Sequence, residues 1–325
     1  MNKINITRLT LIAALCATAA VQCEDYATKG DEPYFPPMVK GDDGRRFLWA
    51  PQPGERQCYE PSFSPNGKKV AVSYRHGRWG RDGELAILDL TSGDLDIVLG
   101  DNGVKCPAWS PSGEWLAYQS SEPSTPPYIW VVRADGSANH RVDVDWAYTP
   151  KWGADDHTLF FTCAGIYPRN DVVVKYDLVT SELTVLYKSE YLYNCAGYVR
   201  PGPGAEKVAF RTVNDITHEG VICSLAFMDA DGANLRVEWQ PEEPAFGFPE
   251  CWSPDGKYLV LNYYNPMADD MQYYCYEVKT RRASLLTMSK PGADPHGYYG
   301  ASWGPHGDVV FATDEGWLYL LKAPE

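Results

Sequence analysis

The sequence predicts an all-β protein, a six-bladed β-propeller built from four-stranded antiparallel blades. Three observations predict it: a recurring strand–turn–strand unit, the regular spacing of its copies, and an aromatic content of 13% with 22 Tyr and 11 Trp. The unit is clearest at residues 248–261, where Trp252 ends one apolar stretch and a Ser-Pro-Asp-Gly turn leads into another. Pro presets φ and Gly accepts positive φ, so this turn reverses the chain tightly.

Copies of the unit follow one another at roughly 40 to 50 residues, a spacing typical of propeller blades. Clear copies begin at Phe63, Trp109 and Trp303, and degenerate copies begin at Trp152 and Val199. We expect the aromatic residue that ends each first strand to be buried between blades. Each such ring contributes about 2–3 kcal/mol of transfer free energy when it is buried.

Length and charge narrow the class of protein further. The 325 residues suit one propeller over 45–325, because propellers commonly reach this size as a single domain. The formal net charge of −14 repels phosphate backbones, and no basic stripe offsets it, so we expect no nucleic-acid partner. The simplest role of this charge is to keep the protein soluble. No stretch of 18 apolar residues follows the N-terminal segment, and no spanning helix is predicted there.

Residues 1–23 have the pattern of a secretory signal peptide, since Lys3 and Arg8 precede an apolar stretch. Two processing routes stay open. The small residues at 17–19 offer an ordinary cleavage site, whereas the run at 20–23 resembles a bacterial lipobox in which Cys23 is lipidated. The first route predicts a free exported protein, and the second predicts a membrane tether through Cys23. Residues 24–44 are acidic, contain Pro and form a predicted flexible linker.

The chain has nine cysteines, of which Cys16 lies in the signal segment. Export permits disulfides, although sequence does not give their connectivity. Cys58 and Cys106 both precede blade anchors, and neighbouring inner strands make them the most favoured pair. For all seven cysteines after Cys23, however, structural or free buried thiols are the favoured interpretation. No Cys-x-x-Cys occurs, so no zinc site and no other metal site is predicted.

Each repeat supplies four short strands. In the first blade we expect them at 58–64, 70–74, 84–90 and 94–99, with a hairpin turn at 89–93. Outer strands of later blades, with their turns, are predicted in the segments 128–136, 172–181, 183–187, 221–228, 273–278, 283–287 and 317–321. Blade six lacks an outermost strand in this pattern, while residues 47–50 form a spare strand before the first repeat. We expect this N-terminal strand to close the ring, which hides a sheet edge.

The segment from Pro107 to Tyr118 reads Pro-x-Trp-Ser-Pro-x-Gly-x-x-Leu-Ala-Tyr and resembles the repeat of TolB-like propellers. The resemblance covers residues 45–325 and recurs six times, so it implies the fold strongly. It implies little about activity, because this fold supports many functions. TolB itself carries a further N-terminal α/β domain, for which the leader of this chain leaves no room. The resemblance therefore implies a propeller module and no direct role in the Tol system.

The first strand of each propeller blade lines the central channel, and its leading residues surround one mouth. The position four residues before each anchor carries Tyr59, Lys105, Tyr148, Cys195, Phe248 and Tyr299. Flat rings with a few charges suit a sugar or peptide ligand. Filling of the space between blades is the alternative role of these rings. The predicted ligand-binding residues are Tyr59, Lys105, Tyr148, Tyr198, Phe248, Tyr298 and Tyr299.

Catalysis is less strongly indicated. Oligogalacturonate lyases resemble this repeat pattern and use histidines at the channel mouth to hold a metal, but only His296 aligns with a mouth loop here. One histidine is too few unless carboxylates join it. No Gly-x-Ser-x-Gly elbow and no phosphate-binding loop occur, and no cofactor is predicted. The weak catalytic candidates are His296, Glu250, Glu60 and Arg200.

Together these patterns predict an exported binding or scaffold module of the periplasm or cell surface, either free or lipid-anchored. Its expected partner is a protein or glycan of the cell envelope, bound through the channel mouth or a propeller face, and the protein is expected to be a monomer. The alternative is a polysaccharide lyase, or another carbohydrate-active enzyme, with its site at the same mouth. Whether the protein is an enzyme stays open, and the sequence favours a role without catalysis.

Overall fold

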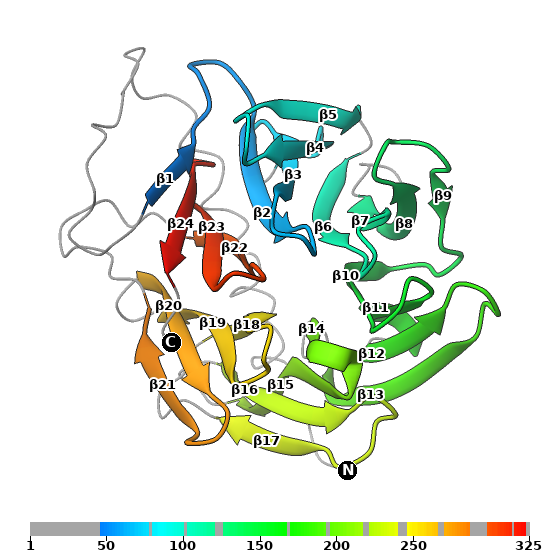
Figure 1. Ribbon diagram of the computed structural model, residues 1–325. Coiled ribbons are helices and arrows are strands. Elements are labelled where there is room, and N and C mark those ends of the chain that lie inside the picture. The colour runs from blue at the N-terminus through cyan, green and yellow to red at the C-terminus, as the bar shows by residue number, and fades with distance from the viewer. Residues whose placement is uncertain are drawn as a thin grey trace, which may run out of the picture.

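The computed structural model describes residues 46–77, 80–100, 103–120, 126–167, 170–192, 196–216, 221–239, 246–265, 270–286, 298–313 and 315–322. The predicted signal peptide with Cys23, the predicted linker at 24–44 and His296 lie outside these residues. The described residues form six four-stranded sheets around a common axis, which confirms the predicted propeller (Figure 1). Their one 3-10 helix is η1 (Pro203–Ala205), and none of the described helices could cross a membrane.

Every sheet is antiparallel, and in blades one to five the strand order follows the chain from the inner to the outer strand. Blade one contains β2 (Gln57–Phe63), β3 (Lys69–Arg75), β4 (Glu84–Asp89) and β5 (Leu95–Leu99). Blade two contains β6 (Val104–Trp109), β7 (Trp115–Ser120), β8 (Tyr128–Arg133) and β9 (His140–Arg141). Blade three contains β10 (Ala147–Trp152), β11 (Thr158–Tyr167), β12 (Asn170–Asp177) and β13 (Leu183–Leu192).

The second half of the ring repeats this order. Blade four contains β14 (Ala196–Pro201), β15 (Lys207–Ile216), β16 (Val221–Asp229) and β17 (Arg236–Trp239). Blade five contains β18 (Phe246–Trp252), β19 (Tyr258–Asn265), β20 (Asp270–Glu277) and β21 (Arg282–Leu285). Blade six contains β22 (Tyr298–Trp303), β23 (Asp308–Thr313) and β24 (Leu318–Lys322).

The fourth strand of blade six comes from the other end of the described chain. β1 (Arg46–Trp49) pairs antiparallel with β24, with Phe47 opposite Tyr319 (Figure 1). The two rings also meet edge to face, with centroids 5.8 Å apart. The first and last blades are therefore joined by backbone hydrogen bonds, in the arrangement that the spare N-terminal strand predicts.

The turns between first and second strands show why the repeat contains serine. In blade five the Ser253 hydroxyl oxygen accepts a hydrogen bond from the Tyr258 amide at 2.9 Å, and the Gly256 amide donates to the Ser253 carbonyl at 2.9 Å. Gly256 has φ +71°, a left-handed conformation that glycine adopts without steric cost. Blades one and two repeat this pattern at Ser64 and Ser110. The serine thus stabilises a turn that other small residues would leave less constrained.

The hydrophobic core is divided among the interfaces between blades. Each of six buried clusters joins two neighbouring blades; one, for example, packs Ile129 of blade two against Phe161 of blade three. Trp152 is 6% exposed within that cluster. The other anchors, which also pack against these clusters as expected, are Phe63, Trp109, Trp252 and Trp303.

Anchor tryptophans also tie neighbouring blades together by hydrogen bonds. The Nε1 atom of Trp152 donates to the Ala108 carbonyl at 2.9 Å, and that of Trp252 donates to the Arg200 carbonyl at 2.9 Å. Both acceptors belong to the inner strand of the preceding blade. Trp109 differs, because its buried Nε1 has no hydrogen-bond partner within the described part of the chain.

This difference gives a matched pair of substitutions. We expect Trp252→Phe to lower the free energy of unfolding by about 1 kcal/mol more than Trp109→Phe, because only the first removes a formed hydrogen bond and leaves a carbonyl without its donor. Both substitutions remove the same volume from half-buried anchors. Urea denaturation of the two variants measures the difference, and equal losses would contradict it.

Cys58 and Cys106, the disulfide pair that their strand positions suggested, are both free thiols. Cys58 is fully buried in the core between blades six and one, whereas Cys106 lies at the inner edge of blade two, with its amide bonded to Glu60. The two side chains belong to different environments although their strands are neighbours. The free cysteines of the described residues are Cys58, Cys106, Cys163, Cys223, Cys251 and Cys275.

Candidate functional site

All six inner strands carry one extra residue, a β-bulge, shortly before the anchor position. At this bulge four residues other than glycine have left-handed φ: Glu60 at 53°, Cys106 at 50°, Thr149 at 52° and Tyr198 at 54°. Such a conformation costs a non-glycine residue about 1–2 kcal/mol. A bulge bends its strand and redirects side chains. Its presence in every blade makes it part of the architecture around the axis.

Gly300 occupies the same position in blade six, with φ +82°. A Cβ at this residue would lie 2.7 Å from Cα of Glu60, which is closer than side-chain atoms approach backbone. Blades six and one therefore meet closely at the axis beside Glu60. In blade five this position is Pro249, whose ring excludes positive φ.

Glu60 and Arg75 form an ion pair near the axis. Nη1 of Arg75 lies 3.0 Å from Oε2 of Glu60, and its Nη2 lies 3.3 Å from Oε1, so the contact is bidentate. The Cys106 amide donates to the same carboxylate at 2.8 Å, across the interface to blade two. Burial works to raise the pKa of Glu60, but Arg75 and the amide outweigh it and the pKa is lowered. The Arg75 side chain is 2% exposed and that of Glu60 is 24% exposed, so solvent reaches the carboxylate.

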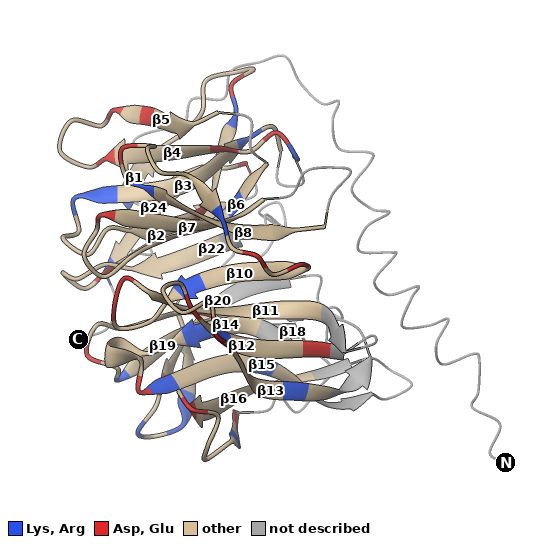
Figure 2. Cartoon of the chain, turned by 90° about the vertical axis from the view of Figure 1, so that its right-hand side faces the viewer, with Lys and Arg blue, Asp and Glu red and all other residues tan. Residues whose placement is uncertain are grey.

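A second charged group joins blades three, four and five. The Arg200 Nη2 lies 3.5 Å from Oε2 of Glu250, and its Nη1 donates to the Val199 carbonyl at 3.0 Å. Glu250 is 8% exposed, and burial raises its pKa although Arg200 and Lys151 work to lower it. Burial and Arg200 lower the pKa of Lys151 to about 8. Figure 2 shows basic residues on both β10 and β14, while many acidic residues lie in turns.

Aromatic side chains and a third arginine complete this part of the ring. The rings of Tyr198 on β14 and Phe248 on β18 have centroids 4.3 Å apart and are tilted by 48°. The Arg211 guanidinium carbon lies 4.8 Å from the Phe248 centroid and 5.3 Å from that of Tyr198. Both rings are half-buried. The site thus combines cations, carboxylates and aromatic rings, as ligand sites commonly do.

The structure brings most of the predicted site residues to the inner strands. Tyr59 is 1% exposed, and Arg75 lies over its ring at 4.6 Å, so this ring offers no open face to a ligand. Lys105 and Tyr148 are half-buried on β6 and β10, and burial lowers the pKa of Lys105. Tyr298 and Tyr299 begin β22, and His296 lies outside the described residues.

One position of the predicted ring needs correction. In blade four Pro201 pairs with Val208, just as Phe63 pairs with Val70 in blade one, so Pro201 occupies the anchor position assigned to Val199. The residue four positions before Pro201 is Gly197, which takes the place in the ring assigned to Cys195, a residue outside the described part of the chain. The 3-10 turn at 203–205 lengthens the connection here and hides the correspondence in the sequence.

Three residues of this site, Arg75, Lys151 and Arg211, are not among those that the repeat pattern predicts. Arg75 and Arg211 belong to second strands, whose ends the repeat pattern does not place near the axis. Lys151 carried a detectable signal, because it directly precedes an anchor. The same position in the other blades holds Ser62, Ala108, Arg200, Cys251 and Ser302.

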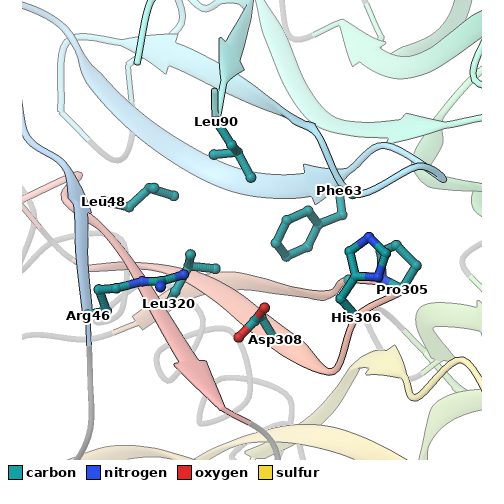
Figure 3. A pocket seen from close by; sticks show the side chains of 10 residues that line it. Arg46, Leu48, Phe63, Leu90, Pro305, His306, Asp308 and Leu320 are labelled. Carbon is teal, nitrogen blue, oxygen red and sulfur yellow. The ribbon is translucent and has the colours of Figure 1, made fainter. Parts of the chain in front are cut away.

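A separate pocket of about 390 Å³ lies at the seam between blades six and one. Leu48, Phe63, Leu90 and Leu320 form apolar walls, and Arg46 and Asp308 add charge (Figure 3). No predicted site residue lines it. In the described part of the chain, no three His, Cys, Asp or Glu side chains are grouped as a metal site would require.

The fold and the axial residues define a six-bladed β-propeller with a charged, aromatic-lined centre. Its fold is that of the TolB-like propellers. A protein from Agrobacterium tumefaciens described as a TolB matches with a TM-score of 0.64 and 17% identity, over 86% of this chain and 94% of its own. TolB from Acinetobacter baumannii matches with a TM-score of 0.57 and 16% identity, over 83% of this chain and 64% of its own.

Oligogalacturonate lyase from Vibrio parahaemolyticus is similar as well, with a TM-score of 0.56 and 15% identity, over 92% of this chain and 99% of its own. Identities this low show a shared fold alone. No protein-family model matches the sequence, and a search of curated proteins gives no match. Function must therefore be argued from the axial residues themselves.

Proposed function

We propose that the protein is an exported binding or scaffold module, which holds a protein or glycan of the cell envelope at the propeller axis. The observation that carries the proposal is the group formed by Glu60, Arg75, Lys151, Tyr198 and Phe248. These side chains come from four blades, and several keep solvent access although they lie far inside the ring. Charged and aromatic groups gathered in this way supply both oriented hydrogen bonds and contact area for a ligand.

The cellular location is part of the same proposal. Residues 1–23 direct export, and the protein then acts in the periplasm or at the cell surface, with lipidated Cys23 as a membrane tether and the 24–44 linker as a spacer. Fractionation of cells that express wild type and Cys23→Ser tests the tether. Release of the variant alone into the soluble fraction supports it, and a soluble wild type refutes it.

The binding role predicts a large effect at Phe248. We expect Phe248→Ala to weaken ligand binding at least about ten-fold, because it removes a half-buried ring that contacts Tyr198 and Arg211. The measurement is capture of envelope proteins, and of glycans on an array, by immobilised wild type and variant.

Ile97→Ala is the matched control for Phe248→Ala, because Ile97 is a 53% exposed apolar residue on an outer strand. We expect it to leave binding unchanged. Equal binding by wild type and Phe248→Ala, at unchanged circular dichroism, would place the ligand away from the axis.

An alternative proposal is a carbohydrate-active enzyme of the lyase type at the same axis. The basic residues around the axis favour it, since they would suit an acidic polysaccharide. Incubation of the protein with polygalacturonate and divalent metal ions tests it by the absorbance of the unsaturated product. If a preparation that binds its ligand does not form this product, the lyase proposal is refuted and the binding role is retained.

A further inference from the structure

Lys151 is a half-buried cation near the axis that forms no ion pair within the described part of the chain. Buried and half-buried charges in folded proteins are normally paired, because removal of a charge from water is costly. An unpaired charge of this kind requires an explanation. One explanation is that a group of a bound ligand pairs with it. A second cation, Arg200, lies on the inner strand of the next blade. Its charge helps to lower the pKa of Lys151.

The groups that face Lys151 do not neutralise it. They are Arg200 on β14, Cys106 on β6, and Glu250 and Cys251 on β18. Burial raises the pKa of Cys106 to about 12 and raises that of Cys251 further, so both thiols are neutral at pH 7. Glu250 is the one carboxylate among them, and its oxygens are engaged by Arg200 and by the Asn262 amide at 3.5 Å.

The guanidinium group of Arg200 is already bonded to other groups of the protein. Its Nε donates to the Glu250 carbonyl at 2.5 Å, its Nη1 to the Val199 carbonyl, and its Nη2 contacts the Glu250 carboxylate. It therefore contributes charge beside Lys151 while Lys151 keeps its donors available. Nearby on the same strand, the Thr149 hydroxyl oxygen is buried without a hydrogen-bond partner among the described residues.

The side chains at the position of Lys151 in the other blades are small, apart from Arg200. They are Ser62, Ala108, Cys251 and Ser302. Two long cations in neighbouring blades thus stand in a ring of otherwise short side chains. At this position of the inner strands, positive charge is therefore confined to blades three and four, in a chain whose formal net charge is −14.

We propose that Lys151 binds a carboxylate of an acidic peptide segment from a partner protein, with Arg200 adding charge beside it. The inference deepens the proposed function and rests on it. A carboxylate oxygen would accept hydrogen bonds from the ammonium group and would relieve its repulsion with Arg200. Charge-assisted hydrogen bonds of this kind are roughly twice as strong as neutral ones.

The aromatic geometry favours a peptide over an acidic glycan. Sugars bind by laying a face on an open aromatic ring, but Tyr198 and Phe248 cover each other at 4.3 Å and Arg211 lies over both. Tyr59 is covered by Arg75 in the same way. An acidic side chain needs a cation and a hydrogen-bond donor, and no free ring face.

The test uses the whole exported protein and three probes: a labelled heptapeptide of glutamate with blocked ends, its glutamine counterpart, and tetragalacturonate. We expect the glutamate peptide to bind at least about ten-fold more tightly than the glutamine peptide, and Lys151→Met to weaken it about five-fold or more. Lys207→Met is the control, because Lys207 is exposed at the start of β15. Fluorescence anisotropy at low ionic strength measures all affinities.

The pH dependence of peptide affinity is a second measurement. It distinguishes a direct contact with Lys151 from a general loss of binding in the variant. Only protonated Lys151 attracts the carboxylate, so the affinity of wild type is expected to fall as the pH rises from 7 to 9. The Lys151→Met variant should bind weakly and without this dependence.

Equal affinities for the two peptides, or an unchanged affinity in Lys151→Met, would overturn the proposal. Tighter binding of tetragalacturonate than of the glutamate peptide would overturn the peptide assignment in favour of an acidic glycan. An envelope ligand that is lost in Phe248→Ala but retained in Lys151→Met would refute this inference and leave the proposed function intact. Peptide binding that depends on Lys151, with no envelope ligand captured, would support this inference and refute the proposed function.

Discussion

Substitution of Glu60 by Gln is expected to lower the free energy of unfolding by about 2–4 kcal/mol. The reason is Arg75, whose side chain is 2% exposed and whose bidentate partner would be lost. Loss of one member of a buried ion pair removes the main compensation of the other charge, and this costs more than loss of the whole pair. Equilibrium denaturation in urea, followed by tryptophan fluorescence, gives the measurement.

The double variant Glu60→Gln with Arg75→Met serves as the control. It removes both charges and replaces the arginine with an unbranched side chain, so much of the lost stability should return. A double variant that is less stable than Glu60→Gln would contradict the argument that the uncompensated charge of Arg75 causes the loss of stability.

The same pair predicts how stability depends on pH. The folded pKa of Glu60 is lowered from its ordinary value, so the folded state binds its proton less readily than the unfolded state. The stabilisation is therefore fully present above about pH 4.5 and is lost as the pH falls through the lowered pKa. Glu60→Gln should lose this part of the acid sensitivity.

Substitution of Lys151 by Met is expected to have the opposite effect and to raise the free energy of unfolding at pH 7 by about 1–3 kcal/mol. The pKa of Lys151 is lowered to about 8, because burial and Arg200 disfavour its charge. The unfolded chain thus binds this proton more tightly than the folded protein does. Methionine has a similar length and carries no charge.

The sign of the pH dependence follows from the same shift. The destabilisation by Lys151 is fully present below about pH 8 and disappears as the pH rises toward the ordinary lysine value of about 10.4. The stability difference between wild type and Lys151→Met should therefore shrink between pH 8 and 10. Lys207→Met should show no such difference, and a destabilised Lys151→Met would contradict the argument.

The combination of a more stable variant and a weaker binder would be informative about function. Binding and catalytic sites commonly retain groups that reduce stability, because the ligand later satisfies them. Loss of binding in a destabilised variant would have a trivial cause. Loss of binding in a stabilised variant would have to come from the removed ammonium group.

Features that depend on local chain geometry could be predicted from the sequence. The turn at Ser253 recurs because a serine hydroxyl, a Pro and a left-handed glycine close it within a few residues. The degenerate copy in blade four lacks this turn sequence. The predicted anchor there, Val199, lies two residues before the observed anchor, Pro201. Site residues on first strands, such as Glu60 and Glu250, could be found by counting from the anchors.

The sequence by itself determined the class of fold, the number of blades and the packing of the anchor aromatics between blades, because repeated turns and alternating apolar stretches act over a few residues. Only the tertiary structure decided that Arg75 would pair with Glu60, that Cys58 and Cys106 would face different environments, and that Lys151 would lie beside Arg200. Those relations join residues from different strands and different blades. They arise when the ring closes and brings six inner strands around one axis, a condition that no single repeat contains.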